Sequence, residues 1–389
     1  MTQIFYRDRF TWLAYLLLAF YGYFLNVLGP ITPFLKSELG LSYTVSSLHF
    51  TAFGVGILLV GLGGHLLIQC IDRWRSLWIG ASGMSLSALL LLAGRTPVIT
   101  IGASFLMGLF GSLILVIVPS VLSDQYGELR AVALSEANVI VSIVAATGPL
   151  MVGGFAHFIG GWRLALGIVA LTPILLYLGF GKVTSPTVAS TPLDLVRARQ
   201  PLQVLFWIYW VAIVLAVSVE FCMIFWSADY LENVLGMPKA DAAQAVSLFI
   251  AAMIIGRIAG SRLVQRFSTP RVVTTTLLVA SIGFLVFWKT GSVSLGLGGL
   301  FITGLGVACL YPLILSLAIG AANNTVQASA RATLASGTAI LTLPLVLGRL
   351  ADAVGIGLAF GLVIFLLLGI FLTIQVAGRI SSAHQLVID

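Results

Sequence analysis

One acidic residue stands alone inside a long apolar segment near the middle of the chain. Glu220 is the only charged residue between Pro201 and Ala228. A carboxylate near the centre of a bilayer costs roughly 3 kcal/mol or more unless it is protonated, paired or facing water. We therefore interpret Glu220 as a residue that binds a proton from one side of a membrane and releases it to the other. The alternative is a structural acid that stays protonated or hydrogen-bonded.

The other residue types that carry catalytic or metal chemistry are dispersed. Cys70, Cys222 and Cys309 form neither a CxxC pattern nor a disulfide framework, and the histidines have no metal-ligand spacing. The sequence contains neither an HExxH pattern nor a phosphate-binding loop of the Walker type. We therefore expect no cofactor, no metal and no enzymatic activity.

The composition indicates that Glu220 sits in a membrane protein. The chain has 389 residues, of which 59% are hydrophobic and 8% charged, whereas a soluble domain has about 25% charged residues. A core of this length could not bury so much apolar surface, so lipid must be the solvent. The net charge of +7 comes from scattered basic residues, which argues against nucleic acid as a partner.

Apolar runs of about 20 residues, the length needed to cross a bilayer, occur twelve times. The runs are continuously apolar and do not alternate between apolar and polar residues as the strands of a membrane β-barrel do, which excludes that fold. We predict spanning helices at 10–34, 44–69, 77–94, 98–122, 131–157, 163–182, 202–230, 242–265, 271–289, 293–319, 330–352 and 356–378.

The longest polar connector, 183–200, falls between the sixth and seventh predicted spans. It suggests an N-terminal six-helix bundle at 1–182, a cytoplasmic linker at 183–200 and a C-terminal six-helix bundle at 201–389. If both termini are cytoplasmic, thirteen Lys and Arg residues in the connectors and at the span ends face the cytoplasm and five face the other side, with Arg257 and Arg349 inside helices. The positive-inside rule then predicts this orientation in the cell (inner) membrane.

The two halves of the sequence resemble each other at a nearly constant offset. The segment Phe34–Leu41 and the segment Tyr230–Met237 are 196 positions apart and read FLKSELGL and YLENVLGM. The same offset relates Gly64 to Gly260, and an offset of 195 relates Pro149 to Pro344. Two six-helix halves repeated in parallel are the architecture of a large class of transporters.

With this repeat, the sequence resembles the major facilitator superfamily over nearly its whole length. The family's signature between spans two and three is a glycine, an aspartate four residues later, then glycine and basic residues. Here the basic end is kept, but His65 and Gln69 replace the expected glycine and aspartate. The second-half copy, Ser261–Arg271, fits better and also has glutamine, Gln265, at the aspartate position. The Gly160-Gly161-Trp162-Arg163 block is similar to the family's usual corner before span six.

The resemblance implies an all-α fold of two bundles related by pseudo-two-fold symmetry, with spans 1, 4, 7 and 10 lining a central cavity. Helical spacing then nominates the residues on the faces of these spans. The candidate cavity residues are Tyr15, Gly22, Tyr23 and Asn26 in the first span, Ser112 in the fourth, Tyr209 and Ser227 in the seventh beside Glu220, and Tyr311 in the tenth. Aromatic stripes of this kind also arise from packing alone.

The resemblance also implies two cytoplasmic gating elements. Its signature loops would latch the halves through Gln69, Asp72, Arg73, Gln265 and Arg266. Because spans five and eight face each other across the halves in this family, Glu136 and Arg257 are expected to form a gating ion pair. The alternative is that each of the two reaches water or pairs locally.

The resulting functional hypothesis is a secondary active transporter that works by rocker-switch alternating access and is coupled to protons through Glu220. Its expected partners are a small organic solute, protons and the bilayer, and it is expected to be a monomer. The segment Gly148–Gly154 is similar to a motif of the family's antiporters with one extra residue, which favours export slightly. An uncoupled facilitator or an uptake symporter for a neutral metabolite stays open, and a receptor or intramembrane enzyme is a more distant alternative.

Overall fold

The computed structural model describes residues 6–181, 183, 202–322 and 325–385. Within these ranges, the side chains at 64–70, 128, 131, 325–327, 329–330, 333 and 381–385 are not described. The chain divides into two units, Met1–Thr191 and Pro192–Asp389. The boundary falls inside the predicted linker 183–200, which lies outside the described residues apart from residue 183.

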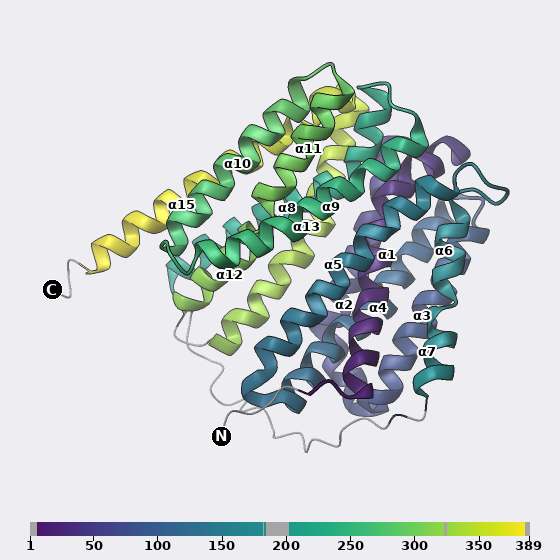
Figure 1. Cartoon of the computed structure of the whole chain (residues 1–389), viewed down its shortest axis with the longest axis horizontal. Coiled ribbons are helices and arrows are strands. Elements are labelled where there is room, and N and C mark those ends of the chain that lie inside the picture. The colour runs from purple at the N-terminus through teal and green to yellow at the C-terminus, as the bar shows by residue number, and fades with distance from the viewer. Residues whose placement is uncertain (1–5, 182, 184–201, 323–324, 386–389) are drawn as a thin grey trace. The chain divides into compact units, whose positions relative to one another are not determined.

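The first unit is entirely helical in its described part, and its helices form one bundle (Figure 1). In chain order it contains α1 (Arg9–Leu39), α2 (Tyr43–Ile71), α3 (Arg73–Ala93), α4 (Pro97–Tyr126), the short 3₁₀ helix η1 (Gly127–Leu129), α5 (Arg130–Phe155), α6 (Arg163–Ala170) and α7 (Thr172–Phe180).

The second unit is likewise helical throughout its described part. It contains α8 (Val204–Asn233), α9 (Lys239–Leu263), α10 (Thr269–Lys289), α11 (Val293–Val307), α12 (Leu310–Gly320), α13 (Thr325–Val354), α14 (Ile356–Ala359) and α15 (Leu362–Gln385). Across the described residues of both units, twelve helical segments are long and apolar enough to cross a membrane. The predicted all-α fold with twelve spans is confirmed.

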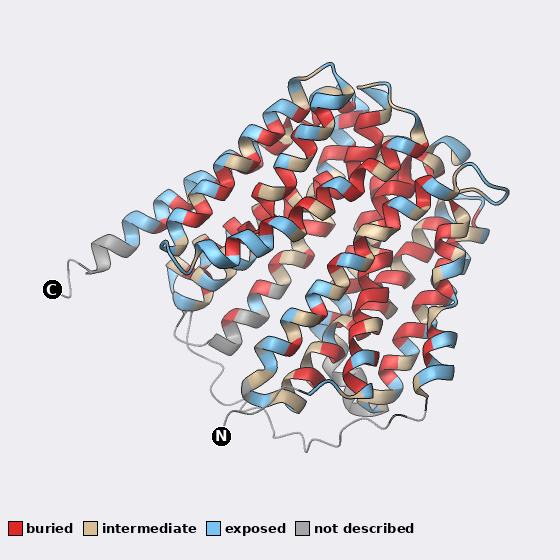
Figure 2. Cartoon of the chain, viewed as in Figure 1, coloured by how far each residue is buried: buried red, intermediate tan, exposed pale blue. Residues whose placement is uncertain are grey.

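The helices α1 and α8 are the most deeply packed spans of their units. Buried residues occupy 78% of the most apolar window of α1 and 67% of that of α8, and α1 is largely red in Figure 2. In their own units, α1 packs chiefly on α5 and α4, and α8 packs on α13, α15 and α12. The candidate cavity residues of these two helices therefore lie on elements whose positions are fixed by neighbours on several sides.

The internal repeat is visible in the way the helices pack. A Cβ atom at Gly108 in α4 would clash with the carbonyl oxygen of Phe53 in α2. In the second unit, a Cβ atom at Gly304 in α11 would clash with the carbonyl oxygen of Phe249 in α9. Both residues of the second pair lie 196 positions after those of the first. A small residue at the same point of each unit thus allows two spans to approach closely.

The repeated segments that follow the first and seventh spans each contain a glycine in the left-handed conformation. Gly40 has a φ of 61° and Gly236 a φ of 68°, a left-handed conformation that glycine adopts without steric cost. The N–H of Leu41 donates to the carbonyl of Lys36 (3.0 Å), and the N–H of Met237 donates to the carbonyl of Leu231 (3.0 Å). Gly40 is the C-cap of α1, whereas Gly236 lies beyond the end of α8 and its C-cap Val234, and each glycine allows the chain to turn after its span.

Three of the predicted spans are not the single helices that the sequence analysis expects. Span six is divided into α6 and α7 before Pro173, span ten into α11 and α12 before Pro312, and the last span into α14 and α15 at Gly361. At the first two breaks, a proline lacks the N–H that the carbonyl four residues earlier needs, and its ring clashes with that carbonyl. Continuous hydropathy reveals the length of a span, but not these breaks within it.

Candidate functional site

The candidate site of the second unit is built from three helices. Glu220 comes from α8, Arg257 from α9 and Tyr311 from α12. Tyr311 is placed by the break in span ten: Pro312 leaves the carbonyl of Ala308 without its helical donor, and the helix restarts at Leu310. The sequence therefore sets Tyr311 in the first turn of a new helix in the middle of a span.

The broken span is held against α9 next to Arg257. The thiol of Cys309 donates to the carbonyl oxygen of Gly256 (Sγ to O, 3.2 Å). A Cβ atom at Gly260 would meet the sulfur of Cys309, so the missing side chain makes room for this contact. The break in span ten thereby packs on the turn of α9 that carries Arg257.

Glu220 and Arg257 form an ion pair within the second unit. The distance from Nη2 of Arg257 to Oε1 of Glu220 is 3.7 Å, and the two side chains are 42% and 17% exposed, respectively. This separation is too long for a hydrogen bond, and the carboxylate of Glu220 accepts none from the residues that the structure describes. Tyr311 lies close enough to Glu220 to interact with it electrostatically. The acid is thus held by charge and is not locked by hydrogen bonds.

A second charged cluster lies in the first unit, where the chain enters α1. Arg7 donates two hydrogen bonds to the carboxylate of Glu136 in α5, from Nε to Oε2 (2.8 Å) and from Nη2 to Oε1 (2.6 Å). The hydroxyl of Tyr15 donates to Oε2 of Glu136 at 3.3 Å. The hydrogen bonds and charge of Glu136 raise the pKa of Arg7 above its usual value. This arrangement joins the segment before α1 to α5.

The same entry segment is fixed to the end of α4. Asp8 caps α1 by accepting from the backbone N–H of Thr11 (2.7 Å), as expected for an aspartate at this position. Its other carboxylate oxygen accepts from Nε2 of Gln125 (2.9 Å). The hydroxyl of Tyr126 donates to the carbonyl of Tyr6 (2.8 Å). Arg7 is therefore presented to Glu136 by an ordered segment of chain.

The sequence analysis predicts a gating pair of Glu136 with Arg257. In the structure Glu136 pairs with Arg7 in the first unit, and Arg257 pairs with Glu220 in the second. Each of the two residues thus has an oppositely charged partner within its own unit. A pairing across the units stays a prediction, and it would have to compete with both contacts.

The remaining candidate cavity residues are mostly buried within their own units. The hydroxyl of Tyr23 donates to the carbonyl of Ala165 in α6 (2.9 Å). Ser112 donates to the carbonyl of Gly108 (2.5 Å), and Asn26 donates to the carbonyl of Gly22 (2.8 Å). Asn26 and Tyr311 are half-buried, whereas the buried members of the set are Tyr15, Gly22, Tyr23, Ser112, Tyr209 and Ser227. Their contact with a substrate stays a prediction.

The predicted latch residues occupy the ends of helices. Asp72 precedes α3 with a φ of 80°, and the following residue, Arg73, pairs with Asp124 at the end of α4 (Nη1 to Oδ2, 2.5 Å). Gln265 and Arg266 are exposed beyond α9. The side chain of Gln69 lies outside the described residues. A role for these residues between the two units is not tested by contacts within each unit.

Three charged residues near these sites were not singled out by the sequence analysis. Arg7 and Asp124 are the partners of Glu136 and Arg73, and a sequence separation of 129 residues between Arg7 and Glu136 leaves no local signal of the pairing. Asp229 is a fully buried acid in α8. Its position inside the seventh span, nine residues after Glu220, is a signal that could have found it. In the described residues, no group of three or more His, Cys, Asp or Glu side chains could hold a metal ion.

The arrangement of twelve spans and a membrane-embedded ion pair can be compared with known proteins. A family model described as the Major Facilitator Superfamily matches residues 12–341. The chain belongs to the Major Facilitator Superfamily. It is therefore a multi-pass membrane transporter of small molecules and not an enzyme.

Relatives of this superfamily member include proteins with and without an assigned solute. An uncharacterised MFS-type transporter of Yersinia pestis is 26% identical over 376 residues, which cover 90% of this chain and 91% of the relative. A glucose/galactose transporter of Brucella abortus biovar 1 (strain 9-941) is 34% identical over 131 residues, which cover 33% of this chain and 31% of the relative.

Solved structures show the same fold. A bacterial homologue of the human lysosomal transporter Spinster, in an inward-facing and unoccupied conformation, matches with a TM-score of 0.81 and 15% identity, covering 96% of this chain and 97% of that chain. The peptide transporter POT in complex with sulfate matches with a TM-score of 0.74 and 16% identity, covering 95% and 94%. At these identities the likeness concerns the fold alone.

Proposed function

We propose that this protein is a proton-coupled secondary transporter of a neutral or weakly polar organic solute, in which Glu220 carries the proton. The observation that supports it is an acid inside a span whose carboxylate faces Arg257 at 3.7 Å and accepts no hydrogen bond from a described residue. Such an acid can exchange its proton without first breaking a hydrogen-bonded network. A purely structural acid is expected to have its oxygens bonded.

The ion pair links protonation of Glu220 to the positions of the helices. When Glu220 is ionised, it attracts Arg257, and this attraction holds α8 and α9 together near the break in span ten. When Glu220 is protonated, this attraction between the two side chains is lost and α8 and α9 are held together less tightly at this point. The charge at this point of the second unit therefore changes by one in each cycle, and alternating access is coupled to that change.

The chemistry of the pair also limits the solute. The positive charge of Arg257 is compensated by Glu220, so the site offers a carboxylate, a guanidinium and the phenol of Tyr311 without a net charge. A neutral solute with hydroxyl or amide groups fits such a site better than a strong anion. Because part of the chain is similar to a glucose/galactose transporter, glucose and galactose are the first solutes to test.

We assign the protein to the inner membrane as a monomer, with both termini in the cytoplasm. The excess of basic residues at that end of the spans supports this orientation. The direction of transport is part of the same proposal: the partial antiporter motif in α5 favours export, and uptake is the alternative. Solute accumulation under pH gradients of opposite sign, in vesicles of known orientation, distinguishes the two.

The decisive experiment compares wild type with Glu220→Gln in proteoliposomes. Proton entry is followed with an entrapped pH-sensitive dye while glucose, galactose and then a panel of neutral metabolites are added under an imposed pH gradient. We expect a solute that moves protons through wild type, is not accumulated by Glu220→Gln, and is still exchanged by that variant at equal pH. If Glu220→Gln accumulates the solute with the same pH dependence as wild type, Glu220 does not carry the proton.

A further inference from the structure

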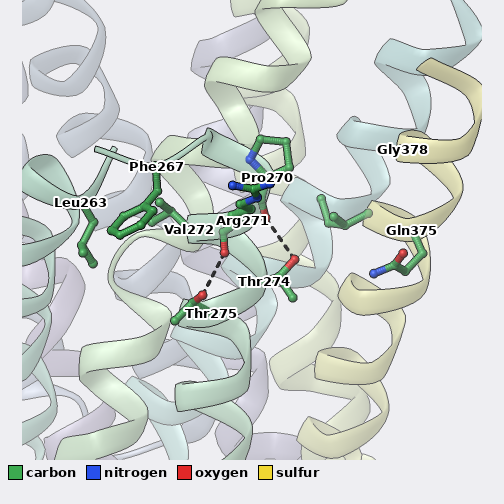
Figure 3. Close-up of a pocket in the computed structure, with 10 residues that line it drawn as sticks. Leu263, Phe267, Pro270, Arg271, Val272, Thr274, Thr275, Gln375 and Gly378 are labelled. Carbon is green, nitrogen blue, oxygen red and sulfur yellow. Dashed lines mark hydrogen bonds between the residues drawn. The ribbon is translucent and has the colours of Figure 1, made fainter. Parts of the chain in front are cut away.

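A groove with a volume of about 640 Å³ opens at one end of the second unit, away from Glu220 and Arg257. It lies between the end of α9, the beginning of α10 and the end of α15 (Figure 3). The count of basic residues assigns this end of the spans to the cytoplasm. The transport mechanism proposed above does not involve the groove, so its shape and chemistry need their own explanation.

The internal repeat shows why the second unit is hollow at this point. In the first unit, Trp74 and Trp78 of α3 contact each other with ring centroids 5.8 Å apart, and Trp78 contacts Tyr177 of α7 at 5.3 Å. The residues 196 positions after the two tryptophans are Pro270 and Thr274, which line the groove. Aromatic rings thus fill the first unit where the second unit has two small side chains.

The walls of the groove combine an apolar surface with a polar edge. Phe267 is 53% exposed and Leu263 is 37% exposed, and both line the groove beside the buried Ile374. On the polar edge, Arg271 lies in the first turn of α10 and Gln375 extends from α15 (Figure 3). The groove is therefore amphipathic.

The donors that face a ligand are few and can be named. The hydroxyls of Thr274 and Thr275 donate to the carbonyls of Pro270 and Arg271 at 3.0 Å, so their protons are already used within α10 (Figure 3). The guanidinium of Arg271 and the amide of Gln375 supply the remaining side-chain N–H groups at the groove. Both are exposed.

The charge around the groove favours an anion. The sequence has no Asp or Glu between Asp241 and Asp352, whereas Arg262, Arg266 and Arg271 follow one another at this end of α9 and α10. No ion pair to Arg271 is formed within the described part of the chain. A guanidinium at the end of a span is well placed to meet a phosphate at the surface of the bilayer.

The surface beside the groove indicates which class of anion the groove binds. The neighbouring outward residues of α15, Leu372 and Val376, are 55% and 47% exposed, and Leu278 of α10 is 54% exposed. Such side chains on a spanning helix face lipid, so the groove continues into the lipid-facing surface. An occupant that enters from there needs a long apolar chain as well as a negative head group.

We propose that this groove binds an anionic phospholipid of the bilayer. The phosphate is held by Arg271 with the amide of Gln375, and an acyl chain lies over Phe267, Leu263 and Ile374. In this arrangement the lipid occupies the volume that Trp74 and Trp78 occupy in the first unit, and it neutralises part of the basic charge at the end of α9 and α10.

Native mass spectrometry of the full chain in detergent tests this, with dioleoyl phosphatidylglycerol and dioleoyl phosphatidylcholine added separately at equal concentration. Wild type should retain phosphatidylglycerol in preference to phosphatidylcholine. Arg271→Gln should weaken phosphatidylglycerol binding about fivefold, which corresponds to about 1 kcal/mol for one basic residue near an anionic surface. The matched control is Lys289→Gln, which removes the same charge from the other end of α10 and should leave binding unchanged.

Two further variants fill the groove. Thr274→Trp introduces the residue that the first unit has at this position, and Gly378→Trp places a ring where no other atom lies within 4 Å of the Cβ position. Either one should reduce the binding of both lipids, and if one variant does not fold, the other decides. Equal retention of the two lipids by wild type, equal losses in Arg271→Gln and Lys289→Gln, or full binding after the groove is filled would each overturn the proposal.

Discussion

The ion pair of Glu220 and Arg257 yields a prediction whose size follows from the structure. At 3.7 Å, two unit charges attract each other by about 1 kcal/mol in water and by about 4 kcal/mol at the effective dielectric typical of a protein surface. Because 42% of the Arg257 side chain is exposed, solvent screening places the pair in the lower half of that range. We expect a coupling free energy of about 1–2 kcal/mol between the two residues.

The two single variants should not cost the same. Glu220→Gln leaves an arginine that is half exposed and can keep water around its guanidinium, so the loss of stability should be below about 1 kcal/mol. Arg257→Gln leaves an acid that is 17% exposed inside a span without its cation, and should cost about 1–3 kcal/mol. The double variant, which removes both charges, should be more stable than Arg257→Gln alone.

The assay is a double-mutant cycle on thermal unfolding of the full chain in one detergent at one pH. Arg262→Gln is the matched control, because Arg262 is an exposed arginine in the same helix that pairs with no acid in the described residues. Its effect should add to that of Glu220→Gln. If the effects of Glu220→Gln and Arg257→Gln also add within about 0.5 kcal/mol, the two side chains do not interact and the coupling mechanism fails.

Three other variants test contacts within each of the two units. Gly108→Ala should cost about 1–3 kcal/mol of stability, because the new Cβ meets the carbonyl of Phe53. The control Gly102→Ala, where no other atom lies within 4 Å of the Cβ position, should be neutral or stabilising. An equal shift in unfolding temperature for the two variants would contradict the close approach of α4 and α2. Glu38→Gln breaks the paired hydrogen bonds that Arg163 donates to Glu38 (2.9 and 2.5 Å). It should lower the unfolding free energy by about 1 kcal/mol relative to wild type in the same detergent. No change in the unfolding free energy would mean that the bonds are not formed. Pro312→Ala returns an N–H to span ten, so unfolding temperature should be kept while transport in proteoliposomes falls at least severalfold; transport at the wild-type rate would show that the break in the helix is not needed.

The sequence alone was sufficient for the outline of the fold because lipid imposes a strict rule on it. A span must be apolar over about 20 residues and must satisfy its backbone internally, so twelve apolar runs predict twelve helices. The turn glycines Gly40 and Gly236 and the packing glycines Gly108 and Gly304 also leave a repeat that can be read directly. An isolated acid such as Glu220 is equally visible, because it is the only charged residue between Pro201 and Ala228.

The partners of that acid were beyond the reach of the sequence. A span that packs against protein on one side and lipid on the other is apolar all round, so its pattern does not tell which face turns inward. For this reason the sequence analysis did not find that Arg257 approaches Glu220 within the second unit, and it gave no sign that Arg7 approaches Glu136 over 129 residues. The predicted pairing of Glu136 with Arg257 across the units stays a prediction. Tertiary packing decided these contacts, because two charges in a membrane are paired by where the helices place them and not by their separation along the chain.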